Sequence, residues 1–300
     1  MNKKIIATGL SIAIGSTMLI TTAFANTTST SGYDAYKSAI KKTLTAKNFT
    51  ESATITLKDN GNVIASGDNT AKLGIDNKTA SVSATINAGG QTNTIESYKQ
   101  DGKSIFKSSD SPVYNVMNEG QRKNNITQQE GINATKLKDG EMLLDALVGN
   151  LQNYVTLDNK TDGTKDVSVQ LSDSQLPAVV NAAASIVVKN AANGEDRIHQ
   201  ENGETALAKN VLQSMPKLVD NIRVDNVSMQ AQIDKDNNIV NQVIDVTVSG
   251  KDANGTDHTI TADINMNLSQ FNNTTPDKID LTGKQVNTLA SHKEYGEKKN

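Results

Sequence analysis

Residues 260–268 read Ile-Thr-Ala-Asp-Ile-Asn-Met-Asn-Leu, an unbroken alternation of apolar and polar side chains. Successive side chains of a β-strand point to opposite faces of its sheet, so one face of this strand is apolar and the other is polar. This pattern is typical of an antiparallel sheet that packs on a core with one face and meets water with the other. We therefore interpret the stretch as one strand of such a sheet.

The same alternation recurs in both halves of the chain. Residues 53–107 are predicted to form a five- or six-strand antiparallel meander, and residues 227–268 a second one. Short strands are expected at 155–157 and 167–171. Turns are predicted where residues that tolerate positive φ separate the strands. These turn sequences are Asn60-Gly61, Gly89-Gly90, Asp101-Gly102, Asp162-Gly163, Asp236-Asn237-Asn238 and Asn254-Gly255.

Four segments have apolar residues at helical spacing instead. They span 33–47, 141–154, 174–192 and 204–219, with Pro177 in the first turn of the third and Pro216 expected to kink or shorten the fourth. Residues 118–138 are predicted to be a long loop. The fold class is therefore α+β: a large curved antiparallel sheet, half-barrel-like, with helices packed on one face.

The ends of the chain differ from this single α+β domain, which we assign to residues 33–271. Residues 1–25 have a basic start, an apolar run and Ala23-Phe24-Ala25, which is the layout of a secretory signal peptide cleaved after Ala25. Residues 26–32 are predicted to be a flexible lead-in and 272–300 an extended polar tail. These features predict a secreted, extracytoplasmic protein.

Composition narrows the function further. There is no Cys, so neither a lipid-modified cysteine nor a disulfide is available. No later apolar run is long enough for a transmembrane anchor. The chain has 30 basic and 33 acidic residues without a concentrated basic patch, which argues against nucleic acid as a partner. Aromatic residues make up only 3% and Trp is absent, which argues against a dedicated sugar-binding module.

The order of the predicted elements resembles that of the superfamily of bacterial lipoprotein-sorting carriers and their mycobacterial lipid-binding relatives. The order is an exported N-terminus, a first helix at 33–47, a meander at 53–107, central helices and closing strands to Leu268. The resemblance implies an unclosed half-barrel that holds acyl chains between its sheet and helices. The lack of a lipobox cysteine departs from many of those relatives and argues against membrane tethering. No functional residue carries over, because the resemblance lies in the order of elements.

The sequence offers no catalytic or cofactor site. It contains neither a Gly-x-Ser-x-Gly elbow nor a phosphate-binding glycine loop. His199, His258 and His292 are far apart and are interpreted as surface residues. Asp234, Asp236, Asn238 and Asp245 have calcium-loop spacing, but Ile239 replaces the glycine that such a loop needs, and a hairpin turn explains the same residues. We therefore predict no catalytic residues, no cofactor and no metal, and a protein that is not an enzyme.

The apolar stripes of the central helices are the candidate binding residues. They either fill the core or line a cavity for an apolar ligand. The candidate lining residues are Leu144, Leu147, Leu151, Val179, Val180, Ala183 and Val187. We expect a secreted, non-enzymatic binding protein, a carrier of lipid or another apolar ligand in the cell envelope. The alternative is a structural or interaction protein of the cell wall or extracellular matrix.

Overall fold

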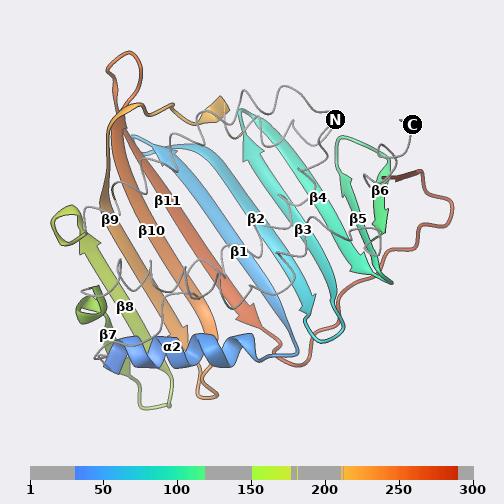
Figure 1. Ribbon diagram of the computed structural model, residues 1–300, viewed down its shortest axis with the longest axis horizontal. Coiled ribbons are helices and arrows are strands. Elements are labelled where there is room, and N and C mark those ends of the chain that lie inside the picture. The colour runs from blue at the N-terminus through green and yellow to red at the C-terminus, as the bar shows by residue number, and fades with distance from the viewer. Residues whose placement is uncertain (1–30, 119–150, 177–180, 182–210, 212, 290–300) are drawn as a thin grey trace, which may run out of the picture.

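The computed structural model describes residues 31–118, 151–176, 181, 211 and 213–289. They form one large, open and curved sheet of 12 strands, with one long helix across the ends of several strands (Figure 1). The strand order is β12-β6-β5-β4-β3-β2-β1-β11-β10-β9-β8-β7. Neighbours are antiparallel except β12, which runs parallel to β6. The predicted antiparallel sheet is thus confirmed.

The N-terminal half begins with the helix and continues as a six-strand meander, of which the first five strands correspond to the predicted meander at 53–107 and the sixth lies beyond it. Its elements are α2 (Ser31–Leu44), β1 (Asn48–Asp59), β2 (Asn62–Gly74), β3 (Thr79–Ala88), β4 (Gln91–Gln100), β5 (Lys103–Ser108) and β6 (Tyr114–Asn118). Asn60 and Gly61 both have positive φ in the β1–β2 turn, where the sequence predicts it.

The C-terminal half is a second meander. It contains β7 (Thr156–Asn159), β8 (Lys165–Ser172), β9 (Asp220–Ile233), β10 (Ile239–Lys251) and β11 (Asp257–Ser269), followed by β12 (Val286–Thr288). Two short 3₁₀ helices, η2 (Leu151–Tyr154) and η3 (Asp173–Gln175), flank β7 and β8. β11 pairs antiparallel with β1, from Thr50 opposite Ser269 to Asp59 opposite Ile260, and this seam joins the two meanders into one sheet.

One face of the sheet is apolar from β8 through β11 and β1 to β3. The register places Met266 opposite Ala53, and Leu73 opposite both Phe49 and Ala80, on this face. We call it the apolar face. Its buried residues form a cluster around Phe49 and Leu73, and a second cluster joins α2 to β8–β10 through Tyr36, Ala39 and Ile40. Each Val, Leu, Ile, Phe or Met side chain that is fully buried here contributes roughly 1.5–3 kcal/mol.

Next to their prolines, two of the predicted helices are not α-helical at the residues that the structure describes. The helix expected over 174–192 begins with only the 3₁₀ helix η3, because Leu176 precedes Pro177 and is extended, with φ −81° and ψ 130°. The helix expected to reach 219 ends at Ser214, two residues before Pro216. The signal segment 1–25 and the predicted loop 118–138, except its first residue, lie outside the described residues. No helix in the described ranges is long and apolar enough to cross a membrane.

Residues 272–289, within the expected polar tail, bind the opposite face of the sheet. We call them the C-terminal strap. They contact one row of side chains that runs across neighbouring strands. The Thr274 and Thr50 hydroxyls lie 2.6 Å apart, and the Asp277 carboxylate lies 2.8 Å from Lys72 Nζ. The Asp277 N–H also donates to Ser81 Oγ at 2.9 Å.

The strap reaches Gln100 next. The Gln100 side chain pairs with the main chain of Ile279, accepting at 2.9 Å and donating at 3.0 Å. In β5 and β6 the buried apolar side chains lie on the face that the strap covers, which is the opposite of their side in β1–β3. Ile105 lies opposite Tyr98 in the same row as Ser81, so it faces the strap and not the apolar face. Ile279 and Leu281 pack on Ile105 and complete a small second core around β5 and β6.

We expect Ile279→Ala to destabilise the protein by about 1–2 kcal/mol, because it removes part of the cover over Ile105. Thr275, which is exposed in the same strap, provides the control. Thr275→Ala should change the free energy of unfolding by less than about 0.5 kcal/mol. Urea unfolding followed by circular dichroism measures both. Equal effects of the two substitutions would show that the strap does not depend on this packing.

Candidate functional site

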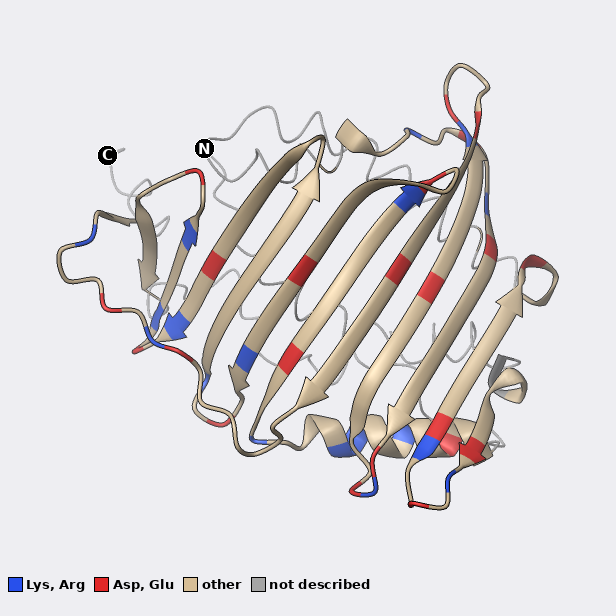
Figure 2. Ribbon diagram, turned by 180° about the vertical axis from the view of Figure 1, so that it is seen from behind, with Lys and Arg blue, Asp and Glu red and all other residues tan. Residues whose placement is uncertain are grey.

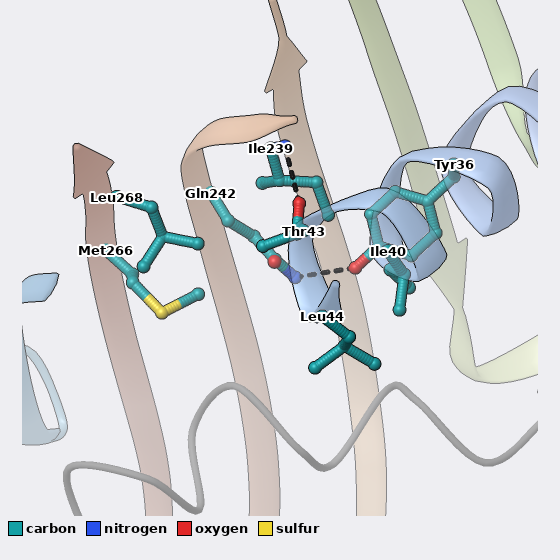
Figure 3. Close-up of a pocket in the computed structure, with 8 residues that line it drawn as sticks. All are labelled: Tyr36, Ile40, Thr43, Leu44, Ile239, Gln242, Met266 and Leu268. Atoms are coloured by element: carbon teal, nitrogen blue, oxygen red, sulfur yellow. Dashed lines mark hydrogen bonds between the residues drawn. The ribbon is translucent and has the colours of Figure 1, made fainter. Parts of the chain in front are cut away.

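An apolar hollow lies between the second half of α2 and the ends of β10 and β11 (Figure 3). It is shallow: its own volume is about 20 Å3, and the surrounding 310 Å3 includes space open to solvent. Its lining residues are Tyr36, Ile40, Thr43 and Leu44 from the helix, Ile239, Gln242, Met266 and Leu268 from the sheet. Six of these eight side chains are hydrocarbon, thioether or aromatic, so the hollow suits an apolar group.

The sequence of α2 explains how its residues reach the hollow. Tyr36, Ile40 and Thr43 recur at helical spacing and face the sheet, while Lys41 and Lys42 face water in the last turn. The N-terminal end of the helix lies tightly against the chain before β7. A Cβ on Gly32 would come within 2.8 Å of the Val155 carbonyl oxygen, so only glycine allows this approach.

Two buried hydrogen bonds fix α2 to β10. Gln242 Nε2 donates to the Tyr36 hydroxyl at 2.9 Å, and the main-chain N–H of Ile239 donates to Thr43 Oγ1 at 2.9 Å. Tyr36 and Gln242 each expose only 4% of their surface. Burial raises the pKa of the Tyr36 hydroxyl, and the hydrogen bond from Gln242 opposes this effect only in part. The hydroxyl therefore stays protonated and neutral at physiological pH.

The apolar face continues beyond the hollow. From Met266, the same face runs along β11 through Ile264 and Ala262. The residues beside them on the neighbouring strands are also apolar and only partly buried. They are Ile55 and Leu57 on β1, Ile244, Val246 and Val248 on β10, and Val227 on β9. The helix α2 lies at one end of these strands, so it covers only part of the apolar face (Figure 1).

The opposite face is polar over most of the sheet. Along β1 and β2 it presents residues such as Ser52, Thr54, Asp68 and Thr70. Figure 2 views this side, where acidic positions lie near the middle of several neighbouring strands. Cross-strand hydrogen bonds join some of the polar groups, for example Asn241 Nδ2 to the side-chain oxygens of Asn265 and Asn267. This face is suited to water or polar partners.

Most candidate lining residues from the sequence cannot be compared with this hollow. Leu144, Leu147, Val179, Val180, Ala183 and Val187 lie outside the described residues. Leu151 begins η2, but its side chain is not described. The structure does describe Asn181, which follows the candidate residue Val180 in the sequence. Asn181 accepts a hydrogen bond from the Val224 N–H at 2.7 Å, beside an irregularity in the β9–β10 register.

Sequence reasoning missed the polar residues of the apolar face. Gln242 and Glu51 occupy inward positions, and Glu51 is fully buried between Ala71 on β2 and Leu268 on β11. The strand pattern could have revealed Glu51, since Phe49, Glu51 and Ala53 are every second residue of one strand and must therefore point their side chains to the same face. A charged residue at an inward position marks a place where the core needs a polar group.

Among the residues that the structure describes, neither His258 nor the residues with calcium-like spacing belong to a group that could hold a metal ion. His258 is partly buried, with Nδ1 2.9 Å from an Asp59 carboxylate oxygen and Nε2 3.8 Å from an Asp252 carboxylate oxygen. Asp234 caps the β9–β10 turn by accepting from the Asn238 N–H at 2.7 Å, whereas Asp245 lies within β10. In the part of the chain that the structure describes, no three His, Asp or Glu side chains are grouped to hold a metal ion. His199 and His292 lie outside that part.

Comparisons with known proteins do not assign a family. No protein-family model and no curated protein matches the chain. Among solved structures, the ywiB protein from Bacillus subtilis has 6% identity and a TM-score of 0.16, covering 74% of this chain and 91% of its own. A bifunctional dehydratase-cyclase domain in ambruticin biosynthesis has 12% identity and a TM-score of 0.13, covering 78% of this chain and 79% of its own.

A third solved structure, from Thermobifida fusca, carries the description of a thioesterase II by proposal only. It has 10% identity and a TM-score of 0.11, covering 82% of this chain and 90% of its own. None of the three is a lipoprotein-sorting carrier by its description. Likenesses this low carry no argument about fold or function.

The Tyr36–Gln242 pair can be tested by a double-mutant cycle. Tyr36→Phe should destabilise the protein by about 1–3 kcal/mol, because it leaves the buried Gln242 amide without its acceptor. Gln242→Leu should destabilise the Tyr36→Phe variant less than it destabilises the wild type. The difference, which is the coupling energy of the pair, should be about 1 kcal/mol. Urea unfolding measures the cycle. Strictly additive effects would contradict a direct interaction.

The raised pKa of Tyr36 predicts alkaline destabilisation. In the unfolded chain its hydroxyl ionises near the ordinary value of 10.0, but in the folded protein it keeps its proton to higher pH. Above that value the unfolded state binds fewer protons than the native state, so the free energy of unfolding falls as pH rises. Tyr36→Phe should make this fall shallower between about pH 9.5 and 11. Parallel pH profiles for the two proteins would contradict the burial of an ionisable hydroxyl.

Proposed function

We propose that the protein is a secreted, non-enzymatic carrier that binds a lipid or another apolar ligand on the apolar face of its sheet. The observation that supports this most directly is the extent of that face. A continuous row of partly buried side chains, including Ile264, Ala262 and Val246, extends from the hollow into the part of the face that α2 does not reach. Apolar area of this kind binds a chain-like hydrocarbon without requiring specific polar contacts.

The central helices would form the other side of this ligand site. We infer that the amphipathic segments 141–154, 174–192 and 204–219 place their apolar stripes over the sheet, with Leu144, Leu147 and Val180 among the contacts. Asn181 supports this arrangement, because it holds the third of the four predicted helical segments against Val224 of β9. The resemblance to lipoprotein-sorting carriers implies the same layering.

Gln242 would recognise the polar end of the ligand. Its Nε2 is engaged by Tyr36, and its carbonyl oxygen remains an acceptor at the wall of the hollow. An amphipathic ligand with a hydroxyl or amide donor fits such a wall, since one buried acceptor in an apolar surrounding favours a donor over a bare hydrocarbon. A fatty acid or acylated molecule has both an apolar body and a polar end.

Ligand binding can be measured with a fluorescent fatty acid. We expect the purified protein to take it up, and native mass spectrometry to detect a co-purified lipid. Ile264→Gln should weaken uptake about tenfold, because it places an amide on the apolar face. The matched control is Asn265→Gln, which changes the next residue of the same strand on the polar face. Circular dichroism confirms that both variants are folded.

A lipid-free mass together with no fatty acid uptake would overturn the carrier proposal. The alternative, an interaction protein of the cell wall or matrix, would then be favoured by the broad polar face with its cross-strand amide ladder of Asn241, Asn265 and Asn267. Sedimentation with isolated cell-wall polymer tests that alternative directly. A protein that remains in the supernatant would argue against it.

A further inference from the structure

Exposed lysines and exposed aliphatic side chains gather where the end of α2 meets the β2–β3 turn. We call this surface the basic rim, and its residues are Lys41, Lys42, Leu44, Lys47, Ile75 and Lys78. Leu44 and Ile75 each expose 51% of their surface, which is unusual for large aliphatic residues. The two segments are joined by the main chain, since the Ile75 N–H donates to the Lys47 carbonyl at 2.8 Å.

The charge of the basic rim is opposite to that of the whole protein. It contains four lysines, and the exposed acidic residues next to it are Asp76 and, in the β9–β10 turn that is bonded to α2, Asp236. The complete chain has a formal net charge of −3. On a protein with negative net charge, a local positive surface is where anionic partners are attracted.

We propose that the basic rim docks on an anionic lipid bilayer. Lysine side chains can place their ammonium groups among lipid headgroups while Leu44 and Ile75 enter the boundary with the acyl chains. A polyanion such as nucleic acid would be served by the lysines but would gain nothing from the two aliphatic side chains. The combination therefore favours a bilayer, which offers both negative charge and hydrocarbon.

The position of Leu44 connects this surface with the ligand site, so the inference rests on the proposed function. Leu44 is both exposed in the basic rim and part of the lining of the hollow, next to Met266 and Leu268 on the sheet side. A protein docked through the basic rim would have the mouth of its hollow at the bilayer surface. An apolar ligand could then pass between the membrane and the apolar face with little exposure to water.

Vesicle binding tests the proposal. The full chain is mixed with vesicles of one part phosphatidylglycerol to three parts phosphatidylcholine, or with phosphatidylcholine alone, and bound protein is separated by flotation. We expect binding to the anionic vesicles and release in 0.5 M salt, a concentration of about three times the physiological value. The Lys41→Glu/Lys42→Glu variant should bind at least about tenfold more weakly, since each lysine near such a surface contributes about fivefold.

The aliphatic part of the basic rim has a matched control at the other end of β2. Ile75→Ser should weaken vesicle binding about threefold or more, because it removes the inserted side chain. Val63→Ser should leave binding unchanged, although Val63 is even more exposed at 61%. Equal binding by the wild type and the lysine variant, or equal effects of Ile75→Ser and Val63→Ser, would overturn the proposal.

Fatty acid uptake without vesicles separates this proposal from the proposed function. We expect the lysine variant and Ile75→Ser to keep wild-type uptake in solution while they lose vesicle binding. Normal uptake by a wild-type protein that ignores anionic vesicles would overturn the docking proposal and leave the carrier proposal standing. Binding to DNA but not to vesicles would also overturn it. Loss of both uptake and vesicle binding by the folded wild type would overturn both.

Discussion

The pairing of β1 with β11 is the interaction on which the rest of the structure depends. Two segments about 200 residues apart in sequence form one continuous ladder, from Thr50 opposite Ser269 to Asp59 opposite Ile260. Without this seam each meander would have an open edge with unpaired N–H and C=O groups, and each apolar face would be narrower. The seam also places Met266 and Leu268 beside Ala53 and Phe49, so it forms the centre of the core.

Helix α2 and the C-terminal strap stabilise this sheet from its two sides. The helix covers the apolar face near the ends of β7–β10 and is fixed there by buried polar bonds to Ile239 and Gln242. The strap crosses the other face and ends as β12 beside β6. Among the elements that the structure describes, helix α2 and the strap contact the margins of the sheet, and neither contacts the middle of the apolar face. The proposed ligand site and the proposed docking surface both follow from the position of α2 at one end of the apolar face.

Several local features were predictable because they depend on neighbouring residues. Asn60-Gly61 and Asp101-Gly102 form turns with positive φ, and the strands that they connect alternate as predicted. The shortening before Pro216 was predicted, whereas Pro177 was placed in the first turn of a helix and the structure has only the 3₁₀ helix η3 before it. The alternation of side chains along each strand places Glu51 and Gln242 on the inward face. The groups that surround them depend on how their strands pair with other strands.

The sequence by itself determined the alternation of 260–268, the hairpin turns and the sidedness of most strands, because these follow from backbone sterics and from burial of every second side chain. Only the tertiary structure decided that β1 meets β11, that the apolar side changes at Ile105, and that the strap binds the row from Thr50 to Gln100. Many strands of this chain have equivalent polar and apolar faces, so local pattern does not select a partner. The selection comes from burying all the apolar faces at once, which is a property of the whole chain.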